Sequence, residues 1–111
     1  MEPALTLEEA KAVVATLPNA RVTEQSIKDK IEKVEYYTVN ETGTLCMIKM
    51  QNGWISSGFS APADPGNFDA AVGQRYAYEN AFRPLWQLEG YLLRDKLATG
   101  AIISPTENPT T

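Results

Sequence analysis

Apolar side chains recur at helical spacing near the start of the chain and predict a short first helix. Thr6 is followed three residues later by Glu9, which is the sequence signature of a capping box. The apolar positions continue to Leu17, and Pro18 then ends the pattern. We expect residues 1–20 to form a helical extension ahead of the main domain.

A second helix is predicted from Thr23 onwards. Thr23 can cap its first turn, because its hydroxyl can accept a hydrogen bond from a free backbone N–H. One face of this helix carries apolar residues while charged residues lie between them. The apolar positions are Ile27, Ile31 and Val34. We expect this helix to lead directly into a strand.

Two antiparallel strands are predicted after the second helix. The segment EYYTV is β-branched and aromatic, NETG follows as a turn, and TLCMIKM then alternates in its side-chain pattern. Residues of one face of the second strand are expected to point into the core. These residues are Cys46, Ile48 and Met50.

A third strand, WISSGF, is predicted to pair with the second through a tight hairpin. Asn52 and Gly53 favour a type I′ turn, in which both central residues have positive φ. The register set by this turn pairs Met50 with Ile55 and Ile48 with Ser57. The three strands then form a meander with one face available to be covered by helices.

Two helices are predicted after the sheet, one on each side of Pro84. The first runs from about Phe68 to Ala81 and has one side of small residues, which lets another backbone approach closely. These small residues are Ala70, Gly73, Ala77 and Ala81. Pro84 would clash with the carbonyl of Asn80 in a continuous helix, so we expect a break near Arg83.

The last helix, which continues to Leu97, carries two apolar stripes. One comprises Leu85, Leu88 and Leu92, and the other comprises Trp86, Leu93 and Leu97. A domain of this size has one core, so the second stripe either contacts a partner subunit or is sandwiched within its own domain. Both alternatives stay open.

These patterns define an α+β fold. We expect a small antiparallel three-stranded β-meander, preceded by one or two short helices and followed by two helices packed on the sheet and on a partner subunit. Residues 21–98 form a single domain in this prediction. Residues 99–111 are rich in Pro, Thr and Asn and are expected to form a flexible tail.

The composition narrows the chemistry that is available to the chain. Among its 111 residues there is no histidine and a single cysteine. The Ser-His-Asp and Cys-His catalytic arrangements and the ordinary zinc sites therefore have no histidine to build on. Cys46, in an apolar strand, is interpreted as a small core residue. We expect a protein that is not an enzyme and that has no cofactor and no metal.

Charge and length indicate which partners to expect. A formal net charge of −4 argues against duplex nucleic acid, because phosphate contacts need clustered Lys and Arg. No apolar run approaches the roughly 20 residues that cross a membrane, so no membrane partner is expected. A chain this short buries a smaller share of its surface than a large domain does, and a homo-oligomer would add to that burial.

Aromatic rings beside arginines predict a face that binds a nucleotide-type ligand. Rings can stack on a base, and guanidinium groups can bind phosphate oxygens bidentately. The candidate ligand-binding residues are Phe68, Arg75, Tyr76, Asn80 and Arg83.

The alternative interpretation of the same residues is structural. In that case Phe68 and Tyr76 belong to the core, and Arg75 pairs with Glu79 at a helical spacing of four. Asn80 would then cap the helix carbonyls that the proline leaves without a donor. The sequence alone does not separate the two interpretations.

The segment DPGNFDAAVGQRYAYENA followed by LWQLEGYLL closely resembles a family of small tailed-phage proteins. That family is typified by gene product forty-nine of one lytic phage and gene sixty-six of another. The resemblance extends over about residues 23–97 and includes the NGW hairpin, where members typically carry NGF. It implies a phage or prophage origin and an accessory protein that acts in the host bacterial cytoplasm.

A looser resemblance concerns function. A small antiparallel sheet followed by two helices looks like the phage sponge proteins that counter Thoeris defence by sequestering a cyclic ADP-ribose signal. This resemblance implies an oligomeric anti-defence sponge that binds a cyclic nucleotide signal without turnover, with its pocket between subunits. The alternative is a protein-interaction module that binds a host protein, which the acidity and the surplus apolar stripe favour.

Overall fold

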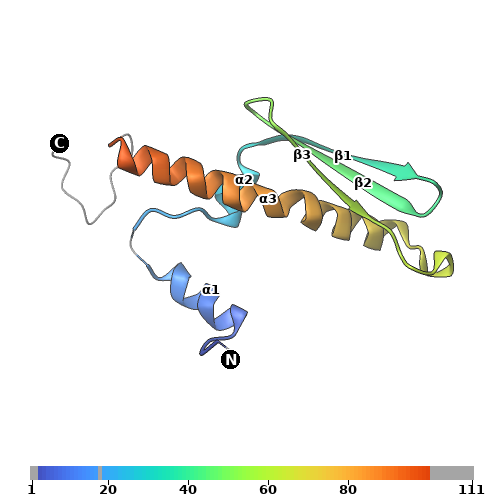
Figure 1. Cartoon of the computed structure of the whole chain (residues 1–111), viewed down its shortest axis with the longest axis horizontal. Coiled ribbons are helices and arrows are strands. Elements are labelled where there is room, and N and C mark those ends of the chain that lie inside the picture. The colour runs from blue at the N-terminus through green and yellow to red at the C-terminus, as the bar shows by residue number, and fades with distance from the viewer. Residues whose placement is uncertain (1–2, 18, 101–111) are drawn as a thin grey trace.

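A three-stranded antiparallel sheet lies at the centre of the fold, and one long helix runs along one of its faces (Figure 1). The computed structural model describes residues 3–17 and 19–100. In chain order the elements are α1 (Leu7–Ala15), α2 (Glu24–Lys28), β1 (Ile31–Val39), β2 (Gly43–Met50), β3 (Ile55–Ser60), the short 3-10 helix η1 (Pro65–Asn67) and α3 (Ala70–Ala98). The expected α+β class and the meander order β1-β2-β3 are confirmed.

The core lies between the sheet and α3. Alternate residues of β2 point to the helix side, as predicted, and Cys46 and Ile48 have no exposed surface. The buried apolar residues are Ile27, Cys46, Ile48, Met50, Ala77, Ala81, Phe82 and Leu85. The interpretation of Cys46 as a core residue is therefore confirmed.

The predicted register of the β2–β3 hairpin is wrong by one residue. Lys49 pairs with Ile55, and Ile48 pairs with Ser56 rather than with Ser57. The loop therefore has three residues, and only its last residue, Gly53, has a positive φ, of 92°.

The physical reason lies in the side chain of Asn52. Its amide oxygen accepts a hydrogen bond from the backbone N–H of Trp54 at 3.0 Å, which stabilises a turn in which Asn52 keeps a negative φ. Gly53 N–H also donates to the Met50 carbonyl at 2.9 Å. This arrangement is the three-residue hairpin with a left-handed glycine, an alternative to the type I′ turn.

The shift in register exchanges the two faces of β3, because side chains alternate along a strand. Ser56 is buried, and Gly58 lies against α3. Ile55, which the predicted register paired with core residue Met50, is 53% exposed on the open face of the sheet. Phe59 shares that face and is also exposed.

The second helix is shorter than predicted, and β1 begins earlier. α2 ends at Lys28, so that Ile31 and Val34 belong to β1 instead of to the helix. Ile31 pairs with Met50 and Val34 pairs with Ile48. Strand pairing with β2 therefore overrides the local helical spacing, which is a tertiary effect that a sequence pattern does not contain.

The predicted break at Pro84 is also wrong, because α3 continues through the proline as one helix of 29 residues. The side chains of Ala81 and Leu85, one on each side of Pro84, are almost completely buried against the sheet. Burying a leucine contributes about 1.5–3 kcal/mol, which is comparable to the roughly 3 kcal/mol that a proline costs inside a helix. Packing on the sheet therefore offsets the proline.

Close contact between β3 and α3 depends on a glycine. A Cβ atom on Gly58 would lie 2.3 Å from the Ala81 nitrogen and 2.4 Å from the Ala77 oxygen. The buried hydroxyl of Ser56 donates to the Ala81 carbonyl at 2.6 Å. The prediction that the small side of the helix lets another backbone approach is confirmed, and β3 supplies that backbone.

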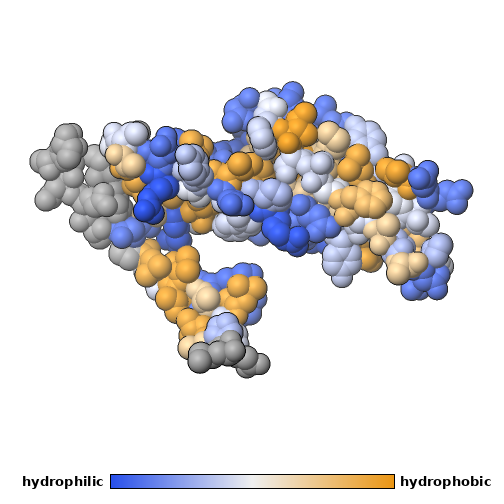
Figure 2. Space-filling model, in the orientation of Figure 1, coloured by the Kyte–Doolittle hydropathy of each residue, from blue (hydrophilic) through white to orange (hydrophobic). Residues whose placement is uncertain are grey.

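At the N-terminal end, α1 forms with the predicted capping box between Thr6 and Glu9, and none of its residues is buried. It stands apart from the sheet and from α3 in Figure 1. Figure 2 shows apolar side chains exposed over α1. At the other end, Gly100 has a φ of 78° beyond the last turn of α3, and the rest of the predicted tail lies outside the described residues.

Two glycine substitutions test this packing with opposite expected signs. We expect Gly58→Ala to destabilise the fold by about 3 kcal/mol, because its Cβ would overlap helix backbone that cannot move aside. We expect Gly90→Ala on α3 to stabilise the fold by about 1 kcal/mol, because nothing lies within 4 Å of its Cβ and alanine favours helix. Urea unfolding of both variants measures the difference, and equal stability of the two would contradict the close approach at Gly58.

Candidate functional site

The five candidate ligand-binding residues lie at or near the first half of α3, but they do not all face the same way. Phe68 directly follows η1, and the other four lie on α3 itself. Helix side chains turn by about 100° per residue, so Tyr76, Asn80 and Arg83 fall on one side. Arg75 lies roughly 140° around the helix from Asn80.

Arg75 takes part in contacts of its own. Its guanidinium forms an ion pair with Glu79 at 2.5 Å, and it lies 5.8 Å from the centre of the Tyr78 ring. The Arg75–Glu79 pair that the structural interpretation predicted is therefore confirmed. Arg75 remains 70% exposed at its side chain, so the pair lies at the surface.

Asn80 connects the helix to the edge of the sheet. Its amide nitrogen donates to the Phe59 carbonyl of β3 at 2.9 Å, and its amide oxygen accepts from Arg83 at 3.2 Å. The prediction that Asn80 caps the helix carbonyls near Pro84 is wrong, because its side chain bonds to Phe59 and Arg83. Instead, Asn80 satisfies a carbonyl of an edge strand and holds the Arg83 guanidinium beside it.

Phe68 and Tyr76 line the same small hollow, which has a volume of about 180 Å³. The end of β3 and the loop after it, from Ser60 to Pro62, form its other wall. Tyr76 is 60% exposed, so the interpretation of Tyr76 as a core residue is wrong. Its position facing outward at the hollow leaves most of its ring open to solvent.

A second hollow lies where the β2–β3 hairpin tip meets the second half of α3. This apolar groove has a volume of about 410 Å³. Its apolar lining comprises Met50, Trp54, Leu85, Leu88 and Leu92. The sequence did predict that the three leucines share a stripe, but it gave no sign that the hairpin tip would meet them.

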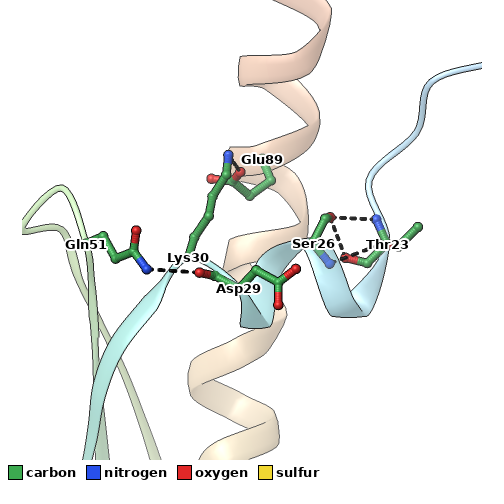
Figure 3. A network of polar contacts seen from close by, with 6 residues as sticks. All are labelled: Thr23, Ser26, Asp29, Lys30, Gln51 and Glu89. Atoms are coloured by element: carbon green, nitrogen blue, oxygen red, sulfur yellow. Dashed lines mark hydrogen bonds and ion pairs between the residues drawn. The ribbon is translucent and has the colours of Figure 1, made fainter.

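A polar network fixes the corner of the domain beside the apolar groove (Figure 3). Lys30 forms an ion pair with Glu89 of α3, whose side chain is only 17% exposed. The Gln51 amide donates to the Asp29 carbonyl at 3.0 Å, and the Gln51 backbone N–H donates to the Lys30 carbonyl at 2.8 Å. Thr23 and Ser26 close a capping box at the start of α2. The hairpin tip, α2 and α3 are thereby joined.

Burial favours the neutral forms of Cys46 in the core and of two tyrosines near it. Burial raises the pKa of the Cys46 thiol, although a hydrogen bond with Tyr36 lowers it in part. Burial likewise raises the pKa of Tyr36 and of Tyr78. A thiol with a raised pKa carries little thiolate at neutral pH, so Cys46 is suited to packing and not to nucleophilic attack.

The described residues contain neither a candidate metal site nor a helix that could cross a membrane. Among residues 3–17 and 19–100, no group of three or more His, Cys, Asp or Glu side chains could hold a metal ion. In the same part of the chain, no helix has the length and apolar character to cross a membrane.

Comparison with known proteins gives one match. Residues 22–97 match the family model described as "Phage protein (N4 Gp49/phage Sf6 gene 66) family". No curated protein and no solved structure matches the chain. The resemblance seen in the sequence is thus confirmed at the level of the family, and the resemblance to the Thoeris sponge proteins stays a prediction.

The partly buried Lys30–Glu89 pair should have a larger coupling free energy than the exposed Arg75–Glu79 pair. In a double-mutant cycle with Lys30→Met and Glu89→Gln, we expect a coupling free energy of about 1 kcal/mol or more, because removing either partner leaves a partly desolvated charge. The matched cycle with Arg75→Gln and Glu79→Gln should give less than about 0.5 kcal/mol, because both partners are more exposed. Urea unfolding measures both coupling free energies. A larger value for Arg75–Glu79 than for Lys30–Glu89 would contradict this prediction.

Proposed function

The chain belongs to the Phage protein (N4 Gp49/phage Sf6 gene 66) family, and on this premise we propose that it is an anti-defence sponge that sequesters a cyclic nucleotide-type immune signal without turnover. In this proposal the protein is an accessory product of a phage or prophage, acting in the cytoplasm of the host bacterium. The observation that carries the proposal is that Tyr76, Asn80 and Arg83 share one side of α3, and that Phe68 lines the same hollow as Tyr76.

Each of these groups has a distinct part in the proposed site. The exposed ring of Tyr76 offers a flat surface on which a base can stack, and Phe68 lies in the same hollow. Arg83 is exposed, and its planar guanidinium can bind a phosphate through N–H groups other than the one directed at Asn80. Asn80 acts as a positioning residue, because both ends of its amide already make hydrogen bonds within the domain.

Arg75 is left out of this proposed site. Its guanidinium faces Glu79 and Tyr78, and a phosphate would have to displace the Glu79 carboxylate to reach it. This leaves Arg83, which lies about two helical turns beyond Tyr76 on the same side of α3, as the guanidinium that can receive an anion. For a chain of net charge −4, a second arginine from another copy would help to concentrate positive charge at the ligand.

The size of the hollow also favours a ligand site that is shared between two copies of the chain. Ligand pockets usually have volumes of about 300–1,000 Å³, whereas the hollow lined by Phe68 and Tyr76 has about 180 Å³. The hollow would therefore enclose only part of a cyclic dinucleotide. We propose that a bound signal is shared with the corresponding face of a second protomer, so that the functional form is a homo-oligomer.

The second candidate function is a protein-interaction module that binds a host protein. The open face of the sheet favours it, because three large apolar side chains on that face are about half exposed. They are Tyr37 at 47%, Ile55 at 53% and Phe59 at 52%. The same face also carries two ion pairs, Lys33–Glu35 and Lys49–Glu32, which give it a polar rim of the kind that protein interfaces have.

Ligand binding tests the sponge proposal. We expect the wild-type protein to bind a member of a panel of cyclic dinucleotides, cyclic trinucleotides and cyclic ADP-ribose isomers, as measured by native mass spectrometry. Tyr76→Ala and Arg83→Ala should each weaken binding at least about tenfold, since each removes a stacking or phosphate contact. Arg75→Ala serves as the matched control and should change affinity less than about threefold.

Two results would count against this proposal. A wild-type protein that binds none of the panel would exclude a sponge for these signals. A loss in Arg75→Ala as large as those in Tyr76→Ala and Arg83→Ala would contradict a site that leaves Arg75 out.

The host-protein alternative has its own discriminating variant. If a specific host protein binds the open face, capture from host lysate should be lost in Ile55→Ser and kept in Tyr76→Ala. Ile55 is on the open face and exposed, so its substitution leaves the core unchanged. Capture that survives Ile55→Ser would remove the open face as the binding surface.

A further inference from the structure

The helix α1 is capped and formed, yet its apolar side chains lie in solvent. Leu7 is 70% exposed, Val14 is 44% exposed and Leu17, just beyond the helix, is 48% exposed. These residues follow the spacing of an amphipathic helix and therefore form one face. A helix of nine residues is marginal on its own in water, so this face needs a surface to pack against.

The apolar groove between the hairpin tip and α3 is a surface of matching character. Its residues Trp54, Leu88 and Leu92 are 54%, 42% and 38% exposed. Amphipathic helices bind such grooves through anchors spaced by three, four and seven residues. Leu7, Val14 and Leu17 have this spacing, because the intervals between them are seven and three residues.

The charges around the two surfaces are opposite. A smaller hollow of about 130 Å³ continues the apolar groove and shares Lys30, Glu89 and Leu92 with it. Its lining adds Arg21 and Lys96. Lys30 is paired with Glu89 and Arg21 donates to backbone carbonyls, so Lys96 supplies the positive charge that can attract an acidic helix end. The first turn of α1 carries Glu8 and Glu9. An acidic helix end and a basic hollow attract one another, which sets the direction in which the helix would lie.

The segment that follows α1 directs this helix away from the apolar groove of its own protomer. The Arg21 guanidinium donates to the carbonyls of Leu17 and Ala15 at 3.1 and 3.4 Å, which fixes the end of α1 relative to the chain that follows. Val22, directly after Arg21, packs against the core. In Figure 1 the helix accordingly lies apart from α3 and from the hairpin tip.

From these observations we infer that α1 of a second copy occupies the apolar groove, and that two copies exchange their α1 helices about a twofold axis. Each protomer gives one helix and receives one, so that the contact is self-complementary and closed. The apolar face of α1 covers Trp54, Leu88 and Leu92 of its partner. Glu8 and Glu9 lie toward the basic hollow that contains Lys96. This interface is independent of the proposed signal-binding face.

Sedimentation velocity of the full chain without ligand tests the exchange. We expect the wild type to be a dimer at micromolar concentration. Val14→Asp on α1 and Trp54→Ala in the apolar groove should each weaken dimerisation at least about tenfold, and both sites are exposed within the protomer, so the fold is kept. Tyr91→Ser is the matched control, because Tyr91 is 77% exposed on the same half of α3 but does not line the groove.

A charge exchange tests the direction of the helix. Glu8→Lys and Lys96→Glu should each weaken the dimer several-fold, and the double variant should restore it, because the attraction is then rebuilt with reversed signs. A wild type that is monomeric at all concentrations would overturn the inference. So would a dimer that ignores Val14→Asp and Trp54→Ala, since the interface would then lie elsewhere, for example on the Trp86 side of α3.

Discussion

The arrangement of this domain depends on the close approach of β3 to α3 at Gly58. The peptide backbone of the strand lies directly against the helix backbone at Ala77 and Ala81, with no side chain between them. Ser56, two residues earlier on the same face, adds a hydrogen bond to the Ala81 carbonyl. This short contact brings the large core residues of β2 within packing distance of α3, and the burial of those residues then keeps the helix continuous through Pro84.

The same contact determines which residues meet at the surface. With α3 fixed against β3, Asn80 reaches the Phe59 carbonyl and orients Arg83, while Tyr76 lies beside the end of the strand. Because α3 stays continuous, its second half passes the hairpin tip and forms the apolar groove with Trp54. Had the helix broken at Pro84, the leucines of that half would have had no fixed relation to the hairpin. Both candidate surfaces therefore follow from one backbone contact and one uninterrupted helix.

The sequence predicted those features that depend on neighbouring residues along the chain. The capping box of Thr6 and Glu9, the cap at Thr23, the three strands and the small side of α3 all follow from local spacing, and all are present. The features that it did not predict depend on distant partners. The start of β1, for example, is set by pairing of Ile31 with Met50. The hairpin register is an exception, because the local bond from the Trp54 N–H to the Asn52 side chain decides between two possible turns. The helical rule of about 100° per residue could have separated Arg75 from Asn80, whereas the contact of Asn80 with Phe59 needed the fold.

The Tyr76 face and the apolar groove lie on different halves of α3. This separation limits how assembly and ligand binding can be combined. Tyr76 and Arg83 lie in the half of α3 that begins at Ala70, and the apolar groove lies in the half that ends at Ala98. An exchange of α1 helices would cover the groove half and leave the Tyr76 face uncovered. Two such faces in one dimer would double the number of binding surfaces without placing them together. A signal shared between protomers would then need a second contact, which the open face of the sheet or the Trp86 side of α3 could supply, so that a dimer of dimers is the smallest assembly that satisfies both proposals.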